Sequence, residues 1–153
     1  MLLKSFGGAF ALFFALPAIA QSPPPLPNGT MSPSDAVTAG AKDRDGKRGT
    51  FGMFVRSTGQ SGGHVFLNSE VDYRDPRNLS IDIDMRATKL LRKQVGATPD
   101  QFYKDKWIVV RGTVRRVPIV FLDDRGRGTG KYYFQTHVFV REPGQIAIAP
   151  ANP

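Results

Sequence analysis

The side chains best suited to chemistry in this sequence are two arginines in a glycine-rich stretch, DDRGRGTG at residues 123–130. Arg125 and Arg127 stand in it, and Lys131 follows directly. A guanidinium group binds phosphate or sulfate through two parallel hydrogen bonds, so arginines on such a loop suit an anionic ligand. The alternative is a solvated hairpin tip, because the two aspartates that open the stretch would partly neutralise the arginines.

A second set of candidates is aromatic. The bases of single-stranded nucleic acid stack on exposed rings beside a basic groove. Tyr73, Tyr133 and His137 are the rings that the sequence offers for this role. In KYYFQTHVFV, residues 131–140, alternation puts Tyr133 and His137 on the face that we interpret as exposed. The alternative is that these rings pack across neighbouring strands, the commoner arrangement on a sheet.

Two acids oppose a nucleic-acid ligand. In NLSIDIDM, residues 78–85, Leu79, Ile81 and Ile83 alternate with polar residues, and we expect Met85 to continue this inward face. The same alternation places Asp82 and Asp84 on the outward face. Carboxylates there would repel a phosphate backbone unless cross-strand partners neutralise them.

Catalytic chemistry has little support in the sequence. The chain has no cysteine, which excludes thiolate nucleophiles and thiolate metal sites, and it has only two histidines, His64 and His137. It contains no HExxH motif, and RGRGTGKY departs at both ends from a phosphate-binding loop. We therefore predict a protein that is not an enzyme and that uses no cofactor and no metal.

The elements that must position these residues are mainly strands. Phe51, Met53 and Val55 share one face of a first strand, and a glycine-rich link at 57–63 follows it. The other expected strands are HVFLN (64–68), NLSIDIDM (78–85), WIVVRGTVRR (107–116) and KYYFQTHVFV (131–140). After WIVVRGTVRR we expect an edge position or a bulge at Pro118, beyond which the strand resumes as IVFL. Residues 86–105 change to helical spacing, with a start signal at Thr98-Pro99-Asp100.

This order predicts an all-β domain with one helix. Five strands, with the helix between the third and the fourth, form the Greek-key barrel of the oligonucleotide/oligosaccharide-binding (OB) type. In such a closed barrel the third strand lies between the second and the fifth. The alternative is an open α+β sheet with a helix on one face.

The ends of the chain have a different character. Lys4, a short apolar run and a small-residue site predict a signal peptide at 1–20. Residues 21–48 are rich in proline, serine and charge, and we expect a flexible spacer. The OB-type domain then covers 49–147, and 148–153 is a tail.

Several short motifs resemble a family of bacterial secreted OB-fold domains that occur alone or beside thermonuclease-like domains. They are Phe66-Leu67-Asn68, Asp72-Tyr73, Leu79 to Ile83, Ile108 to Val114 and Pro143 to Ile146. This chain departs from the family pattern at Ser69-Glu70, where glycine is more usual, and in its longer and more basic 123–130 loop. The resemblance implies an OB barrel whose ligand lies over strands two and three. Arg56 then stands at the base of the loop between strands one and two.

The overall charge fits an anionic partner. The formal net charge is +8 and the sequence pI is about 10.1, which favours polyanions but also serves solubility alone. We expect an exported, periplasmic or secreted, non-enzymatic module that binds nucleic acid or another polyanion. The alternative is a structural or protein-interaction module of the cell envelope. We expect no stable membrane insertion once the signal peptide is removed.

Overall fold

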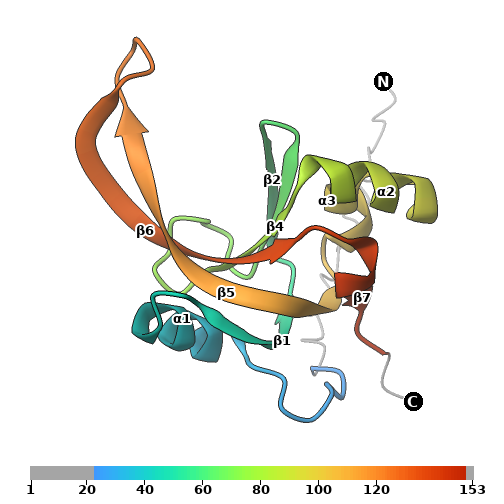
Figure 1. Ribbon diagram of the computed structural model, residues 1–153. Coiled ribbons are helices and arrows are strands. Elements are labelled where there is room, and N and C mark those ends of the chain that lie inside the picture. Colours follow the sequence, from blue (N-terminus) through green and yellow to red (C-terminus); the bar gives the residue numbers. More distant parts are fainter. Residues whose placement is uncertain (1–22, 151–153) are drawn as a thin grey trace, which may run out of the picture.

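A single twisted β-sheet forms the body of the protein (Figure 1). The structure is a computed structural model, and it describes residues 23–150. The strands are β1 (Lys47–Phe54), β2 (Ser57–Ser61), β3 (His64–Asn68), β4 (Leu79–Ile83), β5 (Trp107–Leu122), β6 (Gly128–Val140) and β7 (Ile146–Ile148). The helices are α1 (Pro33–Lys42), α2 (Met85–Val95), α3 (Pro99–Tyr103) and the 3-10 turn η1 (Pro143–Gln145). The sheet order is β1-β5-β6-β4-β3-β2, and β7 pairs with β5.

This topology is mainly β and is consistent with an OB-like fold. The predicted third strand, β4, lies between β3 and β6, as expected, and it runs parallel to β6. The helical region also lies where the sequence placed it, because α2 and α3 connect β4 to β5.

The prediction of a closed, five-stranded barrel is wrong in strand number and in closure. The sheet has seven strands, and β1 and β2 end its hydrogen-bonded path. The first predicted strand breaks where the Val55 N–H donates to Lys106 O and the next N–H, of Arg56, donates to Asn68 O (both 2.9 Å). The expected link at 57–63 supplies β2, which pairs with β3.

The predicted inward faces form the core. Phe51, Met53 and Val55 are at most 1% exposed, and the three aliphatic residues of β4 are fully buried. The prediction that Met85 continues this face is wrong, since its side chain is 47% exposed. The alternation ends at Asp84, which caps α2 by accepting a hydrogen bond from Ala87 N at 2.8 Å.

Part of the predicted flexible spacer is helical. Ser32 and Asp35 form a capping box around Pro33 at the start of α1, a pattern that the sequence displays and that the spacer prediction overlooked. Ala36 is fully buried, and a Cβ on Gly40 would lie 3.3 Å from Thr136 Cγ2. The amphipathic helix thus packs on the sheet, which offsets the entropy of ordering it. The predicted signal peptide lies outside the described residues.

Strands β5 and β6 extend beyond the body as a two-stranded arm (Figure 1). Pairing with β1 ends at Val114 and pairing with β4 begins at Thr136, so residues 117–122 and 128–135 pair only with each other. Pro118 therefore costs no hydrogen bond to a third strand, in agreement with the predicted edge position. The strand also has a bulge, but it lies between Val120 and Leu122 and not at Pro118. Within residues 23–150, no helix combines the length and the apolar character needed to cross a membrane.

Candidate functional site

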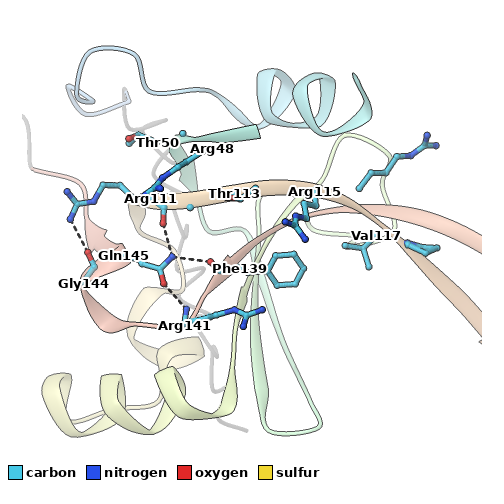
Figure 2. Close-up of a pocket in the computed structure, with 14 residues that line it drawn as sticks. Arg48, Thr50, Arg111, Thr113, Arg115, Val117, Phe139, Arg141, Gly144 and Gln145 are labelled. Carbon is cyan, nitrogen blue, oxygen red and sulfur yellow. Dashed lines mark hydrogen bonds between the residues drawn. The ribbon is translucent and has the colours of Figure 1, made fainter. Parts of the chain in front are cut away.

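The outward side of the sheet carries a basic depression, which we call the arginine groove. Its volume is about 990 Å³. Figure 2 shows the side chains that line it. Five arginines line it: Arg48 from β1, Arg111, Arg115 and Arg116 from β5, and Arg141 directly after β6. The register explains the convergence, because Arg48 pairs with Thr113 and alternation on β5 turns Arg111, Thr113 and Arg115 to one side.

A single glutamine organises one end of the groove (Figure 2). Gln145 Oε1 accepts hydrogen bonds from the backbone N–H groups of Arg141 (2.8 Å) and Glu142 (3.0 Å). Its Nε2 donates to the carbonyls of Arg111 (3.0 Å) and Phe139 (3.1 Å). The side chain thus ties β5 to the end of β6 and fixes the backbone from which the arginines project.

The positive charge of the groove is not neutralised by carboxylates. Within residues 23–150, none of its five arginines forms an ion pair; the paired arginines are Arg77, Arg86 and Arg127. Arg111 donates to the Gly144 carbonyl at 3.0 Å, and the Arg116 guanidinium lies 3.7 Å from the centre of the Phe134 ring. Unpaired cations that line a depression create a positive potential that attracts polyanions.

An aromatic pocket of about 510 Å³ adjoins the arginine groove on the same side of the sheet. Three predicted residues, Tyr73, Tyr133 and His137, line it together. Other lining residues are Phe66, Val71, Ile119, Asn68, Ser80, Gln60 and Gln135. The pocket and the groove meet at β5 and β6, because Arg115 of the groove stands directly opposite His137 of the pocket.

A buried polar network holds the loop that carries Tyr73. Asn78 Nδ2 donates to the Tyr73 carbonyl (3.3 Å) and to Ser80 Oγ (3.0 Å), and its Oδ1 accepts from Glu70 N (3.1 Å). Ser80 Oγ in turn donates to Asn68 Oδ1 at 2.6 Å. Because this network is buried and its members are bonded to one another, it fixes Tyr73 at the rim of the pocket.

The sequence placed Asp82 and Asp84 on the outward face and left open whether cross-strand partners neutralise them; Asp82 has such partners. Asp82 is 8% exposed, and its Oδ1 lies 2.6 Å from His64 Nδ1 while its Oδ2 lies 3.8 Å from His137 Nδ1. Burial raises the pKa of Asp82, but contacts with His137 and His64 lower it by more, so the pKa lies below its ordinary value. Asp84 caps α2 instead.

The expectation that His137 presents an exposed ring is also wrong. Its residue is 5% exposed, because its ring packs between Phe66 and Phe139 at centroid distances of 6.0 Å. Only its edge reaches the aromatic pocket, where Nε2 lies 2.8 Å from Gln135 Oε1. This cross-strand packing is the alternative that the sequence left open.

The other predicted basic residues lie apart from these two depressions. Arg125, Arg127 and Lys131 are exposed on the distal part of the arm, and Arg127 pairs with Asp123 at 2.9 Å. Arg56 is exposed, with its guanidinium 5.9 Å from the Phe54 ring centre. None of the four lines the groove or the pocket.

Sequence reasoning missed the groove arginines as a site. Alternation in VVRGTVRR places Arg111 and Arg115 on one face, but Arg48 and Arg141 are distant in sequence and no local pattern relates them to that face. No cluster of three or more histidine, aspartate or glutamate side chains within residues 23–150 is arranged to hold a metal ion.

Comparison with known proteins gives distant likenesses. No family model and no curated protein matches the chain. It is similar to a putative aspartyl-tRNA synthetase from Leishmania major Friedlin, with a TM-score of 0.47 and 13% identity, over 89% of this chain and 23% of that one. It is also similar to the aspartyl-tRNA synthetase from Entamoeba histolytica, with a TM-score of 0.37 and 16% identity, over 70% of this chain and 19% of that one. The chain thus spans less than a quarter of either protein. At these TM-scores and identities, neither the fold nor the activity of the two proteins can be assigned to this chain.

Proposed function

We propose that this protein is an exported, non-enzymatic module that binds single-stranded nucleic acid. The phosphates lie in the arginine groove, and the bases face the aromatic pocket. The observation that carries the proposal is the continuity of the two depressions: Arg115 and His137 are direct cross-strand neighbours. A polymer lying across the sheet meets unpaired guanidinium groups on one side of β6 and aromatic rings on the other.

This combination matches what single-stranded nucleic acid requires. A positively charged groove follows the backbone, and base stacking on aromatic side chains contributes about 1–3 kcal/mol per base. Tyr73 is 41% exposed at the pocket rim, and the Arg74 guanidinium lies 4.5 Å from its ring centre.

The parts of the proposal that concern export and catalysis rest on the sequence and on the composition of the groove. The apolar N-terminal run with its small-residue site supports export to the periplasm or the medium. The groove is lined by arginine, glycine, threonine and apolar side chains, with one glutamine. Such groups bind phosphate, but none of them is a general base at neutral pH.

The test is the binding of fluorescent single-stranded oligonucleotides, measured by anisotropy over a range of salt concentrations. We expect Arg115→Ala with Arg141→Ala to weaken binding about 10- to 100-fold at low salt, since charge-assisted hydrogen bonds to phosphate are lost. The slope of log affinity against log salt should fall in magnitude by about 1.4, or about 0.7 for each lost phosphate contact.

The control is Arg44→Ala with Lys93→Ala, which removes two exposed positive charges that do not line the groove. This variant should keep the wild-type affinity to within a few fold, because it changes only the net charge. Equal losses in the two variants would show that binding follows total charge, and the groove would then not be the site. No binding at low salt would overturn the proposed function.

A second function is favoured by the arm. Val120, Phe121, Leu122, Tyr132 and Phe134 are between 40% and 63% exposed there. Apolar side chains gathered on a projecting hairpin are typical of protein-interaction surfaces. This observation supports the alternative of a protein-interaction module of the cell envelope, which predicts that the same oligonucleotides fail to bind at low salt.

A further inference from the structure

Both histidines of the chain contact one buried carboxylate. The chain has two histidines in total, and Asp82 lies between them, 2.6 Å from His64 Nδ1 and 3.8 Å from His137 Nδ1. The side chain of Asp82 is 10% exposed, that of His137 is 6% exposed and that of His64 is 40% exposed. We call these three residues the Asp82 cluster.

The cluster lies at the junction of the two depressions. His137 lines the aromatic pocket, and Phe139, which stands opposite Asp82 across β4 and β6, lines the arginine groove. The rings of His64, Phe66, His137 and Phe139 follow one another at centroid distances of 6.0–6.2 Å across the same surface. A polymer that spans groove and pocket therefore passes directly over the cluster.

The hydrogen bonds of His137 leave one position open for a proton. Gln135 Nε2 donates to the Tyr133 hydroxyl at 2.6 Å, so its Oε1 faces His137 Nε2 at 2.8 Å and accepts a hydrogen bond from it. A neutral His137 then turns the unprotonated Nδ1 toward Asp82 Oδ2. This accounts for a separation of 3.8 Å, longer than a hydrogen bond. Protonation of Nδ1 would place a donor there.

The other charges that face the cluster do not change at neutral or mildly acidic pH. Arg115 stands opposite His137 from β5, and Lys89 and Arg92 of α2 line a depression of about 340 Å³ together with His64. Lysine and arginine keep their charge below about pH 9. Among the groups that face the cluster, His64 and His137 are the two whose side-chain type can gain a positive charge near neutral pH.

We propose that the Asp82 cluster is a proton-operated control of the nucleic-acid surface, with the polymer bound more tightly when His64 and His137 are protonated. The inference rests on the proposed function. The mechanism is electrostatic, since a bare carboxylate under the polymer repels phosphate, whereas a carboxylate paired with imidazolium does not. By linkage, binding of the polyanion favours proton uptake, and proton uptake favours binding to the same extent.

The experiment measures the affinity of an oligothymidylate, whose bases do not titrate in this range, at constant ionic strength from about pH 8 to about pH 5.5. For the wild-type protein we expect binding to tighten about tenfold, within the usual range of coupling between two linked binding events. His64→Gln with His137→Gln should lose the pH dependence, so that its affinity at about pH 5.5 equals its own affinity at about pH 8. Asp82→Asn should bind more tightly than the wild-type protein at about pH 8, because the repelling charge is gone.

Two further variants keep the test decisive. His64→Gln alone changes a partly exposed side chain and should reduce the pH dependence even if replacement of the buried His137 disturbs folding. Lys93→Gln, on the exposed face of α2, should leave the pH dependence of binding unchanged. Equal affinities of the wild-type protein at both pH values, or an unchanged dependence in His64→Gln with His137→Gln, would overturn the inference and leave the proposed function standing. No binding at any pH would overturn both.

Discussion

At the scale of single residues, Asp82 decides how the binding surface should be understood. An aspartate on the outward face of a strand would normally be solvated and would oppose a phosphate backbone. Here two imidazoles and two phenylalanine rings enclose it, and interactions with the imidazoles keep it ionised despite burial. In the folded protein, the repulsion between Asp82 and a phosphate backbone therefore depends on its two imidazole neighbours.

The lowered pKa of Asp82 predicts a loss of stability in acid. A carboxyl group whose pKa is lower in the folded state than in the unfolded state stabilises the fold above its ordinary pKa, near 3.8, and loses this effect as the pH falls through the lowered value. We expect Asp82→Asn to lower the free energy of unfolding by about 1–3 kcal/mol near neutral pH, since a charged hydrogen bond is lost.

Denaturant unfolding of both proteins between about pH 6 and about pH 2 measures this effect. The difference between them should shrink as the pH falls, because the contribution of Asp82 disappears from the wild-type protein. Other carboxylates with lowered pKa values, including Asp35 and Asp123, are common to both proteins and cancel in the comparison. A difference that stays constant over this range would contradict the assigned role.

At the scale of elements, local patterns explain most of the boundaries. Ser32 and Asp84 cap α1 and α2, and Pro33 and Pro99 occupy first-turn positions of α1 and α3. Each cap satisfies backbone N–H groups that the helix itself leaves unpaired. Helix α2 then turns one side toward the core, where Ala87 and Leu91 are buried.

Two adjacent leucines of α2 should differ sharply in their contribution to stability. Leu91 is 1% exposed in the core, whereas Leu90 is 37% exposed. Leu91→Ala should lower the free energy of unfolding by about 2–4 kcal/mol through lost burial and a cavity. Leu90→Ala, the matched control, should change it by less than about 1 kcal/mol. Thermal or denaturant unfolding measures both, and similar losses would show that α2 does not pack as described.

At the scale of the whole molecule, the positions of the positive charges matter more for the proposed binding of a polyanion than the total charge of +8. Arginines from β1, β5 and the end of β6 converge in one groove, while those at the tip of the arm stand away from it. One of the tip arginines, Arg127, is already paired with Asp123. The sheet therefore concentrates unpaired charge beside the aromatic pocket and not at the glycine-rich loop of residues 123–130.

This distribution of charge predicts that two pairs of arginines contribute differently to the affinity for oligonucleotides. Arg125→Ala with Arg127→Ala should weaken binding at low salt by less than about threefold, since exposed and partly neutralised charges contribute little. Arg115→Ala with Arg141→Ala should weaken oligonucleotide binding several times more than the tip pair does. Anisotropy titrations of the two double variants under identical conditions decide between them, and a larger loss from the tip pair would move the site to the arm.

The sequence by itself determined the features that depend on near neighbours. Period-two alternation identified the inward faces of β1 and β4, because successive side chains of a strand point to opposite sides. The change to helical spacing located α2 and α3 between the third and fourth predicted strands. The pattern could not show that β1 and β2 form opposite ends of the sheet, since this depends on hydrogen bonds to Lys106 and Asn68, distant in sequence.

Only the tertiary structure decided which side chains act together. The cross-strand register brings Arg48, Arg115 and Arg141 into one groove, although they are far apart in the chain. The same register places His64 and His137 on either side of Asp82. The reason is physical: alternation fixes the side of a strand on which a residue lies, but strand order and register fix its neighbours across the sheet, and charges interact with those neighbours.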